Sequence, residues 1–140
     1  MQQGDTTSHW LYQANQTQQV YLNTQLKQLG LTPDQARVLD FIAAHPQTNQ
    51  RAVSEYLSRQ AASTSNLIKG LRQRGWVDQH LSPTSERERQ LVLTSSGEAL
   101  TIQIAAAFNA LQQQVAAALS STESQQLTKL LQKLTIQLRG

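Results

Sequence analysis

The sequence predicts a mainly α-helical fold with a small β hairpin. Two short helix-sized segments are followed by two strand-like runs, and long helical segments flank this unit on both sides. Two helices followed by a hairpin with a basic tip make a winged helix-turn-helix. The segments are 49–57 and 61–74 for the short helices, 76–81 and 90–93 for the strands, and 8–29 and 95–138 for the flanking helices.

Length and composition narrow the possible classes of protein. At 140 residues the chain is expected to form one domain, 1–140, that buries about two thirds of its unfolded surface. It has no Cys, which excludes disulfides, thiolate metal sites and cysteine-based redox sensing within the chain. No apolar run is long enough to span a bilayer, and residues 1–5 lack the features of a signal peptide. We therefore expect a cytoplasmic protein with no membrane partner.

Two helices are predicted before the central segment. A long helix is expected over residues 8–29, and Gly30 ends it. The second begins at a start signal in which Thr32 is the cap, Pro33 takes the first helical position and Gln35 closes a capping box. It continues to residue 44 and is apolar on most of its circumference, which predicts that it lies inside the protein.

The helix at 61–74 carries the strongest functional signal. Its apolar groups, including the methyl group of Thr64, recur at i, i+3, i+4 and i+7, which predicts a single buried stripe. The remaining side chains, and those just before the helix, have the length and hydrogen-bonding groups that contact base edges and phosphates. The candidates for base contacts are Arg59, Gln60, Ser63, Ser65 and Asn66, and those for phosphate contacts are Arg51, Lys69 and Arg72.

The hairpin supplies a second candidate contact with DNA. Residues 82–89 join its strands as a polar tip that is too long for a tight turn and too charged for a core. Arg87 and Arg89 in this tip are expected to enter the flanking minor groove, with a preference for narrow A/T-rich segments.

Positive charge is concentrated in this central segment. The net charge of +3 is weak evidence by itself, but residues 49–94 hold seven of the twelve Lys and Arg, against four acids. Ordinary solvated charges are the alternative interpretation. The coincidence of these cations with a helix-helix-hairpin pattern favours a surface that binds nucleic acid.

The C-terminal part predicts a homodimer. Thr94 or Ser95 is expected to cap a helix that runs to about residue 119, and Ser121 or Thr122 starts a last helix with leucines at spacings of four, three and four. A winged helix needs none of these long helices, so their apolar stripes require a partner. A second copy of the chain is the simplest partner, and folding back onto the same chain is the alternative.

Three runs, at 31–39, 67–77 and 91–97, resemble the MarR family of bacterial transcriptional regulators. Their order and spacing are kept over roughly residues 20–138. The resemblance implies a sequence-specific, ligand-responsive repressor that binds a pseudo-palindromic operator in double-stranded DNA as a homodimer. In that interpretation residues 31–94 form the DNA-binding part, and 8–29 and 95–138 form the dimerisation part.

The wing departs from the family pattern at one position. The family's wing usually carries Asp-x-Arg, whereas this chain has Ser85-Glu86-Arg87. The resemblance implies that Arg87 contacts DNA, while the acid that helps to hold the wing is missing here.

The family resemblance also implies a small-molecule effector, which we expect to be aromatic or phenolic. The side chains that could line an aromatic pocket are His9, Trp10, Tyr12, Tyr21, Phe41 and His45, although such residues more often serve in cores and interfaces.

Other classes of function fit the sequence less well. No cofactor or metal is expected, and an enzyme is disfavoured because no phosphate loop, Gly-x-Ser-x-Gly or HExxH motif occurs and the three His lie far apart. The remaining alternative is a winged-helix module that binds protein instead of DNA, for which the exposed face of the second short helix should be apolar.

Overall fold

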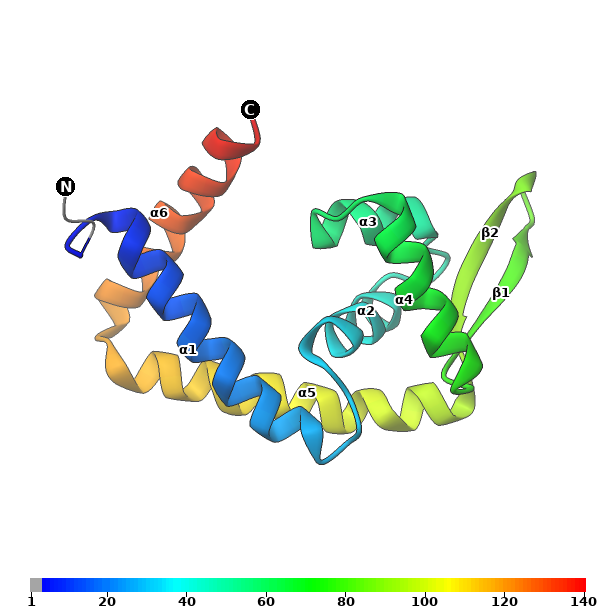
Figure 1. The fold of residues 1–140 in the computed structure, drawn as a ribbon, viewed down its shortest axis with the longest axis horizontal. Coiled ribbons are helices and arrows are strands. Elements are labelled where there is room, and N and C mark those ends of the chain that lie inside the picture. Colours follow the sequence, from blue (N-terminus) through cyan, green and yellow to red (C-terminus); the bar gives the residue numbers. More distant parts are fainter. Residues whose placement is uncertain (1–3) are drawn as a thin grey trace. The chain divides into compact units, whose positions relative to one another are not determined.

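The computed structural model describes residues 4–140, apart from the side chains of residues 85–88. This part of the chain forms six helices and one two-stranded antiparallel sheet (Figure 1), which confirms the predicted mainly α class with a small β wing. The elements are α1 (Thr7–Lys27), α2 (Pro33–Ala44), α3 (Gln50–Leu57), α4 (Ala61–Gln73), β1 (Val77–Ser82), β2 (Ser85–Leu93), α5 (Ser95–Ala118) and α6 (Ser121–Arg139).

The start of α2 follows the predicted signal. The hydroxyl of Thr32 accepts a hydrogen bond from the Gln35 N–H at 3.2 Å, and the Gln35 side chain accepts one from the Thr32 N–H at 3.0 Å. This capping box, with Pro33 in the first turn, satisfies backbone donors that the helix itself cannot pair. Asn49 caps α3 in the same way, since its side chain accepts from the Ala52 N–H at 2.9 Å.

The hydrophobic core of residues 4–107 lies between α1, α2, α4 and the wing. Leu22 and Leu26 of α1 are fully buried, as are Val38 and Leu39 of α2. The expectation that α2 is enclosed on most sides is only partly correct, because Ala43 is exposed. The last turn of α2 leads into the exposed segment 45–47, so this end of the helix is open to solvent.

The wing is longer and its turn tighter than the sequence predicted. The polar segment 82–89 was expected to be a loop, but β2 already begins at Ser85, so Pro83 and Thr84 alone connect the strands. The Ser82 hydroxyl supports this turn by accepting from the Thr84 N–H at 3.2 Å. Charged residues do not prevent strand pairing, because an antiparallel pair of strands can leave one face in solvent, as at the exposed Arg89. The strand register is irregular between Leu81 and Ser82.

Hydroxyl caps also begin the two C-terminal helices. The Thr94 hydroxyl accepts from the Gly97 N–H at 3.1 Å in the first turn of α5. At α6, Ser120 and Glu123 form a second capping box. Hydrogen bonds from the backbone and side chain of Ser120 hold the pKa of the Glu123 carboxyl below its usual value.

The chain divides into two compact units, Met1–Ala107 and Phe108–Gly140, with the boundary inside α5. In the second unit, α6 has no buried residue, and Leu130, Ile136 and Leu138 are among its exposed apolar side chains. None of the helices in the described part of the chain combines the length and apolar character needed to cross a membrane.

Candidate nucleic-acid interface

The helix α4 has one buried stripe and one open polar face. Thr64, Ile68 and Leu71 are buried, as their spacing predicted, and Leu67 is half-buried. Because the helix repeats every 3.6 residues or so, side chains on the other side must point away from this core. The α4 polar face, as we name it, consists of the exposed residues Ser63, Ser65, Asn66, Lys69, Arg72 and Gln73.

The sequence predicted all members of the α4 polar face except Gln73. Asn66, Lys69 and Gln73 are spaced three and four residues apart, so they lie along one line of the helix surface. The same spacing rule that identified the buried stripe could have identified Gln73 as a candidate contact. The face presents amide, hydroxyl and cationic groups without an acid.

The N-terminal end of α4 is held by contacts from α2 and α3. The Arg59 guanidinium forms an ion pair with the Asp34 carboxylate at 2.7 Å, and the Gln50 side chain donates to the Ala61 carbonyl at 3.3 Å. Ser58 turns the chain between α3 and α4 with a left-handed backbone, φ 53°. Gln60 is the N-cap residue, and its side chain makes no capping hydrogen bond. Arg59 and Gln60 are both exposed, and Arg59 is in addition paired with Asp34.

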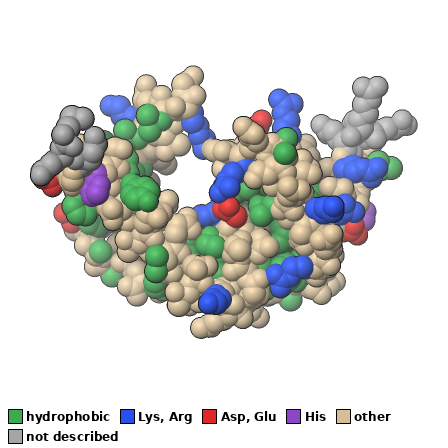
Figure 2. All heavy atoms as spheres, viewed as in Figure 1, with side chains coloured by type: hydrophobic (Ala, Val, Ile, Leu, Met, Phe, Trp, Pro, Cys, Tyr) green, Lys and Arg blue, Asp and Glu red, His purple; other side chains and the backbone are tan. Residues whose placement is uncertain are grey.

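Of the residues predicted to contact phosphates, Arg51 is held only weakly within the protein. Arg51 lies 3.6 Å from the Glu55 carboxylate, but the two side chains are 89% and 72% exposed. Pairs this exposed contribute almost nothing to stability, so Arg51 can exchange its partner at little cost. On the face of the molecule that Figure 2 shows, Lys and Arg side chains (blue) predominate over Asp and Glu side chains (red).

Two arginines of the wing were predicted to contact DNA, and the structure describes the side chain of one of them. Arg89 is exposed and pairs in register with Leu81, itself 61% exposed. The side chain of Arg87 lies outside the described residues. The base of the wing is anchored next to α3, because the Leu91 N–H donates to the Thr48 carbonyl at 2.8 Å.

Arg74 occupies a different place from the other cations of the segment 49–94. Its guanidinium donates to the Gly30 carbonyl at 2.6 Å and lies 3.9 Å from the centre of the Trp76 ring. It follows α4 directly, but its charged group is directed to the turn between α1 and α2.

The residues predicted to bind an effector fall into two groups. Phe41 stacks on His45, with ring centres 4.1 Å apart, and also on Tyr56, at 4.6 Å, a neighbour that the sequence did not suggest. His9 and Trp10 form an edge-to-face pair on α1. Tyr12 is exposed on the same helix, and Tyr21 is half-buried.

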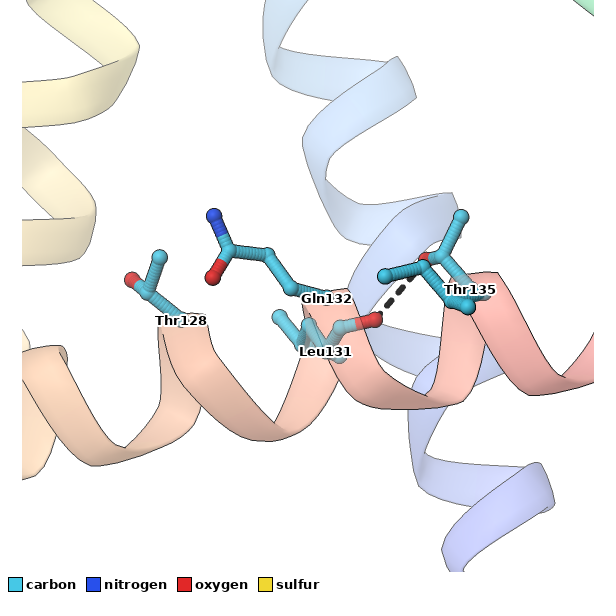
Figure 3. A pocket seen from close by; sticks show the side chains of 5 residues that line it. Thr128, Leu131, Gln132 and Thr135 are labelled. Atoms are coloured by element: carbon cyan, nitrogen blue, oxygen red, sulfur yellow. Dashed lines mark hydrogen bonds between the residues drawn. The ribbon is translucent and has the colours of Figure 1, made fainter.

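A shallow groove on α6 differs in chemistry from the α4 polar face. Thr128, Leu131, Gln132, Thr135 and Ile136 line it, and none of them is charged. Thr128 and Gln132 point to the same side of the helix, and the Thr135 hydroxyl donates to the Leu131 carbonyl at 2.8 Å (Figure 3). The groove offers apolar and neutral polar contacts, which do not favour a phosphate. The described residues contain no cluster of His, Asp and Glu that could hold a metal ion.

Comparison with known protein families identifies the central segment. The model of the MarR family matches residues 29–88. A curated relative, the HTH-type transcriptional regulator YwoH of Bacillus subtilis (strain 168), is 31% identical over 93 residues, which are 64% of this chain and 67% of that protein.

Solved structures share the fold over nearly the whole chain. A DNA complex of S. aureus MepR superposes with a TM-score of 0.87 at 23% identity, covering 94% of this chain and 98% of that one. A probable transcriptional regulator from Pseudomonas aeruginosa gives 0.81 at 26% identity, covering 95% and 99%. The apo form of E. coli MarR gives 0.76 at 25% identity, covering 92% and 96%.

Proposed function

The protein belongs to the MarR family of transcriptional regulators, and from that premise we propose that it is a ligand-responsive repressor that binds a pseudo-palindromic operator as a homodimer. The observation that carries this proposal is the α4 polar face. A helix that buries Ile68 and Leu71 while exposing Asn66 and Lys69 has the form of a recognition helix for the major groove. An interaction module for proteins would expose apolar groups there.

The residues of the interface divide into base contacts and phosphate contacts. Asn66 has the paired donor and acceptor that match adenine, and the exposed groups of Gln60, Ser63 and Ser65 lie on the same helix or at its start. Arg51, Lys69 and Arg72 hold phosphates, which fixes the position of α4 without reading sequence. Arg87 and Arg89 of the wing enter the flanking minor groove.

Arg59 is the candidate for a guanine contact, and the structure adds a partner for it within the protein. Its ion pair with Asp34 holds one guanidinium nitrogen beside the start of α4, and the exposed side chain can exchange this carboxylate for a group on DNA. The pair also orients the N-terminal turn of α4 relative to α2.

A homodimer supplies the second half of the operator contact. In a two-fold arrangement the two α4 helices enter successive major grooves about 34 Å apart, so half-site spacing becomes part of specificity. The exposed leucines on one side of α6, Leu127, Leu130 and Leu138, are the surface for this association. An aromatic or phenolic effector acts by binding more tightly to the dimer conformation with one separation of the two recognition helices than to the conformation with another. The stacked rings of Phe41, His45 and Tyr56 support an effector of this chemistry.

The first test is the salt dependence of DNA binding. We expect the operator affinity to fall steeply between low and moderate salt, with a log–log slope of about −5 if each protomer neutralises three phosphates. The measurement is a fluorescence-anisotropy titration of a labelled duplex, obtained by binding-site selection from random sequences, at several salt concentrations. A slope near zero would contradict the assignment and favour the protein-interaction module.

The role of Asn66 predicts a loss of specificity. We expect Asn66→Ala to lower operator affinity by about 1–3 kcal/mol while leaving binding to random duplex almost unchanged, because only base contacts are lost. The matched control is Arg72→Ala, which removes a phosphate contact from the same face and should weaken both duplexes alike. Equal losses on operator and random DNA for Asn66→Ala would show that this side chain does not read bases.

A further inference from the structure

We infer that Arg74 is a positioning residue, which fixes the angle at which α4 meets DNA by locking the end of that helix to the turn between α1 and α2. This inference rests on the proposed function and adds a device that the general fold does not require. It concerns one cation of the basic segment that is directed away from the α4 polar face.

The first observation is a pair of contacts that hold the Arg74 guanidinium. One of its nitrogens donates to the Gly30 carbonyl at 2.6 Å, a short charge-assisted hydrogen bond. The central carbon of the same group lies over the Trp76 ring, 3.9 Å from the ring centre. The single hydrogen bond and the cation–π contact together hold the guanidinium between Gly30 and Trp76.

The second observation is that both ends of this lock are themselves fixed. Gly30 adopts a left-handed backbone, φ 73°, and the Leu31 N–H bonds back to the Leu26 carbonyl at 3.1 Å, so the turn is tied to the C-terminal end of α1. Leu26 and Leu31 are buried. A side-chain carbon on Gly30 would lie 3.0 Å from an Arg74 nitrogen, so the guanidinium would have to shift to make room for it.

At the other end, the residues after α4 are attached to the wing and to α5. The Trp76 N–H donates to the Leu71 carbonyl at 3.1 Å, and its carbonyl accepts from the Thr94 N–H at 3.0 Å. The Thr94 hydroxyl donates to the Gly75 carbonyl at 2.6 Å. Arg74 is therefore the side chain that links this junction to α1, and a rotation of α4 relative to α1 would have to break its hydrogen bond or its stacking.

The consequence concerns spacing. In the proposed dimer, α1 belongs to the part that holds the two protomers together, so the lock sets how far apart and at what angle the two α4 helices lie. Without it, α4 can tilt. The operator should then be bound more weakly, and duplexes with altered half-site spacing should be discriminated less well.

The test compares Arg74→Met with Arg72→Met in the full-length protein. We expect Arg74→Met to lower affinity for the selected operator roughly tenfold, about 1.4 kcal/mol, without changing the salt slope. Arg72→Met should reduce the slope by about 1.8, one phosphate in each protomer. Arg74→Met should also narrow the affinity ratio between the operator and a duplex with one base pair inserted between its half-sites, which a general loss of stability would not do.

A spectroscopic readout reports the lock independently of DNA. In a Trp10→Phe background, Trp76 is the remaining tryptophan, and Arg74→Met should shift its emission because the stacked cation is lost. Wild-type affinity and slope in Arg74→Met, or a fall in slope equal to that of Arg72→Met, would overturn the inference. Absence of salt-dependent binding in the parent protein would instead overturn the proposed function, and the inference with it.

Discussion

Replacing Leu130 with Glu should leave the protein as single chains and nearly abolish operator binding. Leu130 is 58% exposed in the isolated chain, on a helix with no buried residue, and in the proposed dimer it packs against the partner. A carboxylate at this position would have to be buried without a cationic partner, which costs several kcal/mol in a typical protein interior. Because the two half-sites act together, loss of pairing should reduce operator affinity by roughly 10²–10⁴-fold.

Sedimentation at micromolar concentration gives the direct measurement. The Leu130→Glu protein should have a mass near 15.6 kDa, that of one chain, while the parent should have twice that mass. The control is Gln125→Glu, which adds the same charge on another face of α6, four residues before Lys129. It should stay dimeric and bind the operator like the parent. A dimeric Leu130→Glu protein would place the interface elsewhere.

Features encoded by local spacing were predicted well from the sequence. The capping box of α2 and the buried stripe of α4 depend on residues within seven positions of one another, and the structure confirms both. A local rule was insufficient for the wing. The charges of residues 82–89 suggested a loop, but β2 begins at Ser85. The sequence alone does not show that these residues lie in an antiparallel pair of strands that leaves a face in solvent.

The roles of two arginines depended on partners distant in sequence. Arg59 pairs with Asp34 across 25 positions, and Arg74 bonds to Gly30 across 44. No spacing rule connects such residues, so the sequence could only count both as members of a basic segment. All four of Arg59, Lys69, Arg72 and Arg74 are exposed, but Arg59 and Arg74 each make a contact with a distant part of the chain.

Replacing glycine with alanine should change the free energy of unfolding in opposite directions at Gly97 and at Gly70. Gly97, in the first turn of α5, packs directly on the backbone of the segment that leads into the wing. An added Cβ would lie 2.1 Å from the Trp76 carbonyl oxygen, well inside van der Waals contact. That oxygen cannot retreat easily, because it accepts a hydrogen bond from the Thr94 N–H. Gly70 is in the middle of α4, and a Cβ there would meet nothing within 4 Å.

We expect Gly97→Ala to lower the free energy of unfolding by about 3 kcal/mol or more, because the start of α5 and the base of the wing must move apart. Gly70→Ala should raise it by about 0.5–1 kcal/mol, since alanine loses less backbone entropy in a helix. Urea denaturation at one fixed protein concentration measures both, which keeps any contribution from dimerisation equal. If Gly97→Ala were as stable as the parent, the close approach of α5 to Trp76 would be wrong. If Gly70→Ala were destabilised, the α4 surface at that position would be occupied by something that the single chain does not contain.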